Sequence, residues 1–204
     1  MLVDLSELAK SIGLEPQEVV LPNGSTVSRL VWSGEHLVDL DRIFHNQVDK
    51  MENPIDINGP APAWLVAGLA HIFHPRYVRL NSPDGYVPLG MGRPQGEGSE
   101  ENIKFSVDKS DVSDWLIITC MMKDPSVPLN PDKLGEIVPP EVPMGSKIII
   151  SGRIPNWLTA SLAMAYHGVA KAVACYQPGI GATVSWTHSK GVRLGEVVQM
   201  MFTI

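Results

Sequence analysis

Four of the six histidines stand where their side chains could act together. His71 and His74 lie three residues apart, a spacing that places two side chains on one face of a helix. His167 ends a predicted helix in the second half of the chain, and His188 follows the alternating run 183–187. Imidazole nitrogens bind transition metals and exchange protons near neutral pH. For any one histidine the better explanation is structural, such as a favourable place for a helix-terminal histidine at the negative end of the helix dipole. That explanation weakens for all four together, so we consider them as candidate metal ligands.

A second candidate site is a glycine turn that suits a phosphate. Ser151, Gly152 and Arg153 follow a short β-branched run and precede a predicted helix. Glycine lets the backbone come close to a ligand, the first turn of a helix offers unpaired N–H groups, and arginine adds a forked cation. The matching turn of the first half has Asn58 and Gly59 but proline in place of arginine. A tight turn that needs glycine for its backbone angles would give the same pattern, so for Arg153 both interpretations stay open.

An internal repeat contains both candidate sites. Residues 57–74 and 150–167 align without a gap at an offset of 93, with nine of eighteen positions identical. The shared residues are Ile57, Gly59, Pro62, Trp64, Leu65, Ala67, Leu69, Ala70 and His74, each with its partner 93 residues later. Agreement is weaker upstream, where the strand-like runs 27–32 and 112–120 are the expected counterparts. The chain is therefore read as two copies of one unit of roughly 100 residues.

Within the second copy, the apolar runs predict a strand, a glycine turn, a helix and two further strands. Residues 147–150 suit a strand buried on both faces, and Pro155 stands where a helix could begin. Short strands are then expected at 172–176 and 183–187. This order is the βαβ pattern, so we expect an α/β fold with ligands at the carboxyl edge of the sheet.

The domain boundaries follow from the repeat and from a change in composition. The stretch 90–102 is rich in glycine and acidic residues, lacks apolar periodicity, and is the expected linker. The predicted units are 1–89 and 103–204.

Composition bounds the class of protein. The chain has 204 residues, a formal net charge of −6 and 44% hydrophobic residues, which is typical of a globular protein. The acidic balance argues against duplex nucleic acid as a partner, because such binders carry a basic face. No apolar run is long enough to span a membrane, and the N-terminal residues resemble a helix more than a secretory signal. Cys120 and Cys175 lie in apolar runs and are expected to be buried thiols, so we predict a cytoplasmic protein.

The second copy resembles a known family. The sequence ISGRIPNWLTASLAMAYH, continued by VACYQPGIGATVSWTHS, is similar to the core of the small CRISPR-associated ring nucleases of type III systems, specifically their third family. That core reads roughly S-G-R-x-P-x-W-L, H-x-x-H, Y-D-P-x-x-G and S-H-S. Residues 150–189 cover nearly all of it, and residues 57–83 cover about half of it again.

The resemblance implies a fold, a ligand and a metal. Members of that family are small α/β proteins distantly related to CARF sensor domains, and they cleave cyclic tetra-adenylate with manganese bound by histidines. By resemblance His167 and His188 would be catalytic metal ligands, with His71 and His74 as the helical pair. Arg153 would assist catalysis. Further ligand-binding residues would be Ser151, Gly152, Asn58, Gly59, Pro178 and Ser189.

The departures from the family pattern leave the activity open. Met164 stands where a family histidine would be, and Gln177 stands where the family has aspartate. One hypothesis is that the two copies form an internal pseudo-dimer, or a homo-oligomer, whose halves complete one another and degrade the ring. The alternatives are a sensor or sponge that binds a cyclic oligoadenylate without cleaving it, and an interaction scaffold. The ring size and the product ends are not determined by the sequence.

Overall fold

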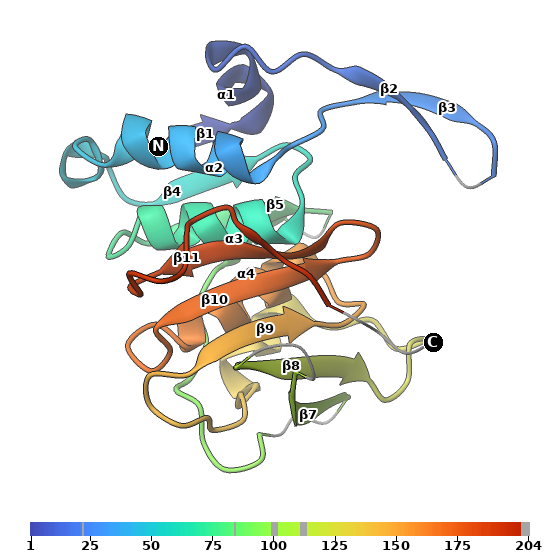
Figure 1. Ribbon diagram of the computed structural model, residues 1–204, viewed down its shortest axis with the longest axis vertical. Coiled ribbons are helices and arrows are strands. Elements are labelled where there is room, and N and C mark those ends of the chain that lie inside the picture. Colours follow the sequence, from blue (N-terminus) through green and yellow to red (C-terminus); the bar gives the residue numbers. More distant parts are fainter. Residues whose placement is uncertain (22, 84, 99–101, 111–113, 201–204) are drawn as a thin grey trace.

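The computed structural model describes residues 1–21, 23–83, 85–98, 102–110 and 114–200 (Figure 1). Two main β-sheets, one from each half of the chain, share their helices and one continuous hydrophobic core. The predicted α/β fold class is confirmed. The CARF relationship remains a prediction.

The first sheet has the strand order β1-β4-β5-β6. Its first three strands are parallel, and the last is antiparallel to its neighbour. The strands are β1 (Leu2–Asp4), β4 (Ile55–Asn58), β5 (Val78–Ser82) and β6 (Gly85–Pro88).

The second sheet has the order β12-β11-β10-β9-β8-β7. Its four middle strands repeat the first sheet: β8, β9 and β10 are parallel, and β11 is antiparallel to β10. The strands are β7 (Ile103–Lys109), β8 (Trp115–Met122), β9 (Lys147–Ser151), β10 (Ala172–Gln177), β11 (Gly181–Thr187) and β12 (Val197–Val198).

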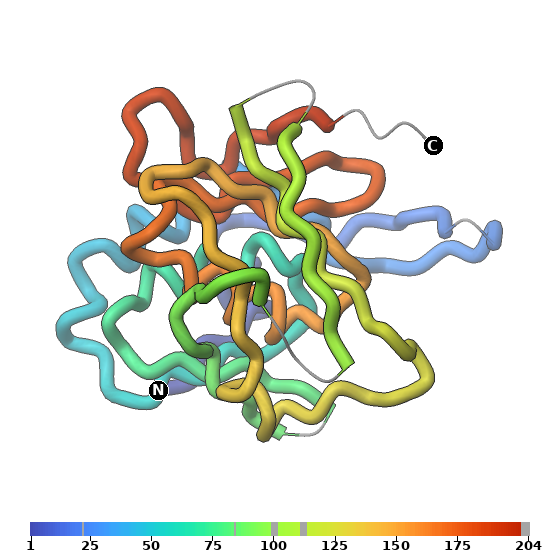
Figure 2. The backbone as a smooth tube through the Cα atoms, turned by 90° about the horizontal axis from the view of Figure 1, so that it is seen from below, coloured from blue at the N-terminus to red at the C-terminus, as the bar shows by residue number. Residues whose placement is uncertain are grey.

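One expected counterpart within the repeat was wrong. The run 27–32 does not correspond to β8, because its strand β3 (Thr26–Arg29) pairs only with β2 (Gln17–Val20) in a separate hairpin. The counterpart of β8 is β1, which lies parallel to β4 as β8 does to β9. The β2–β3 hairpin extends away from the rest of the molecule in both views (Figures 1 and 2).

Helices α3 (Ala63–Ile72) and α4 (Asn156–Ala165) lie side by side and run in the same direction. At their N-terminal ends, Asn156 Nδ2 donates a hydrogen bond of 2.8 Å to the Ala61 carbonyl oxygen. At their C-terminal ends, the rings of His74 and His167 lie 4.4 Å apart. The two glycine turns therefore meet at one end of the helix pair, and the helix-end histidines meet at the other.

Helix α3 also packs against the other half of the chain. Gly68 lies where α3 crosses β11, and an added Cβ there would stand 3.0 Å from the Ser185 carbonyl oxygen. Leu37 of helix α2 (Gly34–Phe44) covers the same point from the other side. Fully buried residues of both halves, such as Leu65 and Trp186, belong to one core. The halves consequently form one packed body.

The remaining short elements are helix α1 (Leu5–Ser11) and the 3-10 turns η1 (Val48–Lys50) and η2 (Pro131–Glu136). Both cysteines are buried thiols, as expected. Burial raises the pKa of Cys175 to about 12. Among the residues described, no helix is long and apolar enough to cross a membrane.

The expected linker contacts the second half. In the described part of 90–102, the Gln95 amide donates to the Pro139 carbonyl oxygen, and the Glu141 amide donates to that of Gly96. Residues 99–101 lie outside the described residues. The unit boundaries remain a prediction.

Candidate functional site

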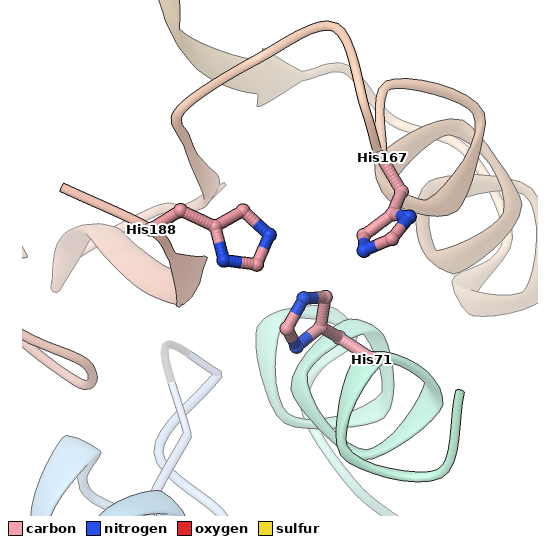
Figure 3. A group of neighbouring side chains, drawn as sticks. All are labelled: His71, His167 and His188. Atoms are coloured by element: carbon pink, nitrogen blue, oxygen red, sulfur yellow. The ribbon is translucent and has the colours of Figure 1, made fainter. Parts of the chain in front are cut away.

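Three histidines from both halves of the chain converge at the C-terminal ends of α3 and α4 (Figure 3). His71 lies in the last turn of α3, His167 just after α4, and His188 just after β11. One nitrogen from each imidazole can be chosen so that all three lie within 4.8 Å of one another. We call these three residues the histidine centre.

The ring of His71 is fixed by its surroundings. It stacks on Trp186 with the ring centroids 5.0 Å apart and the planes 10° from parallel. Its Nε2 atom is buried and has no hydrogen-bond partner among the residues that the structure describes. A buried nitrogen without a partner is costly, so some group that satisfies it is expected.

Burial keeps the inner imidazole neutral. Desolvation by burial, with smaller contributions from the nearby His167, His188 and His74, lowers the pKa of His71 to about 3. The pKa of His167 is also lowered, first by burial and then by His74 and His188. A neutral imidazole has a free lone pair, so these rings are in the form that binds metal.

His74 borders the histidine centre without belonging to it. It is exposed, and its ring contacts that of His167. At the repeat offset of 93, His74 corresponds to His167, and His71 corresponds to Met164. The apolar Met164 therefore cannot supply the ligand that His71 supplies, and no equivalent centre is found among the described residues.

The histidine centre lies at the opposite edge of the sheet from the one expected. Strand β11 is antiparallel to β10, so Thr187 pairs with Ala172 at the start of β10. The His188 amide accordingly donates to the Lys171 carbonyl oxygen at 2.8 Å. The histidine centre therefore lies at the amino edge of the parallel strands. The prediction that these histidines lie at the carboxyl edge was wrong.

The glycine turn that the sequence suggested for phosphate binding lies at the N-terminal end of α4, opposite the histidine centre. Ser151, Gly152 and Arg153 line a cavity of about 600 Å³ together with Pro178 and with Trp64 at the start of α3. The ten residues of α4 separate this end from His167, which is about 15 Å of helix at 1.5 Å per residue. One phosphate group would therefore not reach both Arg153 and the histidine centre in the same molecule, and the expected catalytic role of Arg153 stays a prediction.

A second cavity, of about 660 Å³, is the counterpart of the first. It is lined by Gly59 from the other glycine turn and by Trp157 at the start of α4, whereas the first cavity combines Gly152 with Trp64. Each cavity thus joins the turn of one half to the helix of the other. In the first cavity, Arg153 of the glycine turn supplies a positive charge. In the second cavity, Pro60 stands at the corresponding position, so that turn supplies no charge.

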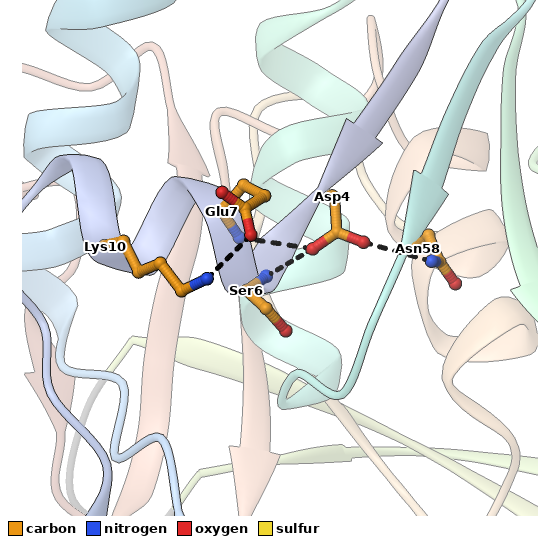
Figure 4. A network of polar contacts seen from close by, with 5 residues as sticks. All are labelled: Asp4, Ser6, Glu7, Lys10 and Asn58. Atoms are coloured by element: carbon orange, nitrogen blue, oxygen red, sulfur yellow. Dashed lines mark hydrogen bonds and ion pairs between the residues drawn. The ribbon is translucent and has the colours of Figure 1, made fainter.

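Asn58 is engaged within the protein (Figure 4). Its Nδ2 donates to Asp4 Oδ2 at 3.2 Å, and its Oδ1 accepts a bond of 2.7 Å from Asn81. Asp4 in turn caps α1 by accepting from the amides of Ser6 and Glu7. These bonds use one donor and one acceptor position of the Asn58 amide group, and its expected role in ligand binding stays a prediction.

Two further expected residues have different surroundings. Gln177, at the family aspartate position, accepts a bond of 2.9 Å from Trp64 Nε1, far from the histidine centre. Ser189 lies next to His188, away from the glycine turns, and its amide donates to Thr187 Oγ1. The expected ligand-binding residues therefore divide between the two ends of the helix pair.

Trp186 was missed by the sequence interpretation. Its ring supports His71 and lies 5.4 Å from that of His188. The alternating pattern of 183–187 already indicated it, because residues two apart on a strand share a face. Trp186 and His188 are such a pair.

The histidine centre fits a transition metal. Its three donors are imidazoles, two are held neutral by burial, and one nitrogen is buried without a partner. Imidazole is a common ligand of zinc, copper, iron and nickel. His71, His167 and His188 would hold the ion.

Comparison with known proteins gives two similarities. Residues 122–199 match the family model of a CRISPR-associated protein, Cas_csx3. An uncharacterized protein of Aquifex aeolicus is 30% identical over 105 residues, which is 90% of that protein and 49% of this chain. That relative is therefore roughly as long as one half of the present chain. The family match supports a CRISPR-associated protein.

Proposed function

We propose, since the chain belongs to the same family as the Aquifex aeolicus protein and matches Cas_csx3 over 122–199, that it binds and cleaves cyclic tetra-adenylate in CRISPR defence. Cleavage of this messenger would switch off signalling. The observation that carries the proposal is the convergence of His71, His167 and His188 from both halves. Neither half alone contains the three ligands, which explains how the chain could remain active although each copy departs from the family pattern.

The chemistry belongs to the histidine end. His71, His167 and His188 would hold a divalent ion, which the resemblance takes to be manganese and which would supply polarisation of a phosphate and stabilisation of the developing charge. His188 is exposed and His167 half-buried, so a phosphodiester can approach from the solvent side, while Trp186 closes the inner side. The attacking oxygen, from water or the ribose 2′-hydroxyl, forms a bond to phosphorus as the bond to the leaving ribose oxygen breaks. The exposed His74, whose ring lies beside that of His167, would exchange the proton.

The glycine-turn end supports a binding role. Arg153 and the N-terminal ends of α3 and α4 favour negative charge there. If only this end is used, the protein is a sensor or sponge that retains the ring without cleaving it. The cavity at Gly152 is the specific observation in favour of that second candidate.

The test is incubation of the purified protein with labelled cyclic tetra-adenylate, with and without manganese or zinc, reading retained ligand and product separately. We expect metal-dependent linear product that is lost by at least roughly 100-fold in His167→Ala and His188→Ala. His45→Ala is the matched control, because His45 is exposed and lies at the end of α2, outside the histidine centre. Arg153→Ala is expected to weaken retention.

The other possible outcomes of this experiment distinguish the alternative functions. Retention without product, unchanged in the histidine variants, would favour the sensor or sponge. Neither retention nor product would contradict both and leave the interaction scaffold.

A further inference from the structure

The ligands of the histidine centre are nitrogen atoms only. Among the residues that the structure describes, the group able to hold an ion consists of His71, His167 and His188, with no aspartate, glutamate or cysteine within the same reach. The neighbouring rings are His74 and Trp186. One of these is a further imidazole, and the other is an indole, which has no lone pair to offer a metal.

The position that could have supplied an oxygen is used elsewhere. Gln177 occupies the family aspartate position, and its Oε1 accepts from Trp64 Nε1 at the start of α3. His71 lies in the last turn of the same ten-residue helix. The length of α3 therefore keeps residue 177 away from the histidine centre, whatever side chain stands there.

Donor type decides which ion a site prefers. Carboxylates, carbonyls and water suit Mg²⁺ and Mn²⁺, whereas imidazole suits Zn²⁺, Ni²⁺ and Cu²⁺, and Mn²⁺ stands lowest in the affinity order for nitrogen ligands. We propose that the histidine centre selects an ion of the zinc class, Zn²⁺ or its spectroscopic substitute Co²⁺, and discriminates against Mn²⁺. The inference keeps the proposed metal dependence, replaces the manganese that the resemblance implies, and does not rest on the identity of the substrate.

The rigidity of the inner ligand strengthens this preference. The His71 ring is stacked on Trp186, which holds one imidazole ligand in place at a site where Mn²⁺ would favour oxygen ligands. Its buried Nε2 has no partner among the protein groups described, and a nitrogen-binding ion nearby would help to satisfy the ring. His188, in contrast, is exposed and is the ligand most easily exchanged.

The test measures metal binding without any nucleotide. Apo protein, prepared with a chelator, is titrated with Co²⁺ while its visible absorption is recorded, and the Zn²⁺ and Mn²⁺ affinities are measured by competition with a fluorescent chelator. We expect Zn²⁺ to bind tighter than Mn²⁺ by on the order of 1,000-fold or more. The Co²⁺ bands should disappear in His71→Ala and His167→Ala and remain in His45→Ala.

Replacing one imidazole ligand by a carboxylate tests whether the donor type causes the metal preference. His188→Asp converts the centre to two imidazoles and one carboxylate, and it should reduce the Zn²⁺ to Mn²⁺ affinity ratio by at least about tenfold. His167→Glu is measured beside it in case the first variant does not fold, which circular dichroism would reveal. The proposal is overturned if wild type binds Mn²⁺ within about tenfold of Zn²⁺, or if folded carboxylate variants leave the ratio unchanged. Turnover is recorded separately, so a failure to cleave cyclic tetra-adenylate does not count against the metal preference.

Discussion

Gly152 lets the second glycine turn pass directly against β8. Its φ of +142° is in the range that side chains rarely adopt, and an added Cβ would overlap the carbonyl oxygen of Cys120. We expect Gly152→Ala to lower the free energy of unfolding by about 2–4 kcal/mol, because both strain and backbone displacement result. Gly145→Ala is the matched control: φ is +76°, the space is open, and the cost should be about 1 kcal/mol. Urea denaturation measures both, and equal losses would contradict the overlap.

The Asp56–Arg79 ion pair makes the free energy of unfolding depend on pH. Arg79 donates to both Asp56 oxygens, at 2.6 and 2.8 Å, and this hydrogen bonding holds the Asp56 pKa below 3.8. Because the folded pKa is depressed, the contribution is complete above pH 3.8 and is lost as the pH falls through the folded value. We expect wild type to lose more stability than Arg79→Met between pH 7 and pH 3, measured by urea denaturation. Parallel losses would mean that other carboxylates dominate.

At the scale of elements, the contact of α3 with β11 positions His71 against Trp186. Gly68 makes that contact possible, since an added Cβ would stand 2.7 Å from Leu37 Cδ1 and 3.0 Å from the Ser185 carbonyl oxygen. We expect Gly68→Ala to cost about 1–3 kcal/mol and to weaken metal binding by moving α3.

The counterpart in α4 supplies the control for this prediction. Ser161 stands 93 residues after Gly68, is fully buried, and its hydroxyl has no hydrogen-bond partner within the described part of the chain. Ser161→Ala removes this unpaired group and should change stability by less than about 1 kcal/mol, or increase it. Thermal melts and Co²⁺ absorption of both variants would decide. A Gly68→Ala protein as stable as Ser161→Ala would contradict the assigned packing.

At the scale of the whole molecule, the histidine centre connects the two halves of the chain. An ion there would contact His71 of the first half and His167 and His188 of the second. An ion that binds only the folded state stabilises it by about 2.7 kcal/mol at a concentration 100 times the dissociation constant. We therefore expect Zn²⁺ to raise the melting temperature of wild type, chelator to reverse the rise, and His71→Ala to show no effect. A similar rise in His71→Ala would place the ion elsewhere.

The dipoles of the paired helices agree with a phosphate-binding role at one end of the helix pair and a metal-binding role at the other. Parallel α3 and α4 direct their positive ends toward Arg153 and the glycine turns, and their negative ends toward the histidines. An anion is favoured at one end and a cation at the other. The net charge of −6 does not oppose either, since both effects are local.

Much of the local structure could be predicted from the sequence. The apolar runs indicated β9, β10 and β11, and Pro155 is the N-cap of α4 as its position suggested. These features depend on residues close together in the chain, so their patterns are visible there. Strand β1 was not foreseen, because three residues before a helix carry too little pattern, and its strand character comes from pairing with β4.

The residues of the candidate site could also be predicted from the sequence, but their arrangement in space could not. The sequence determined that two copies of one motif carry the histidines and that only the second has arginine after its glycine. Only the tertiary structure decided that His71 joins His167 and His188, whereas Arg153 lies at the far end of α4. The reason is physical: the direction of β11 and the parallel packing of α3 on α4 are set by contacts between residues about 100 positions apart, and no local pattern records them.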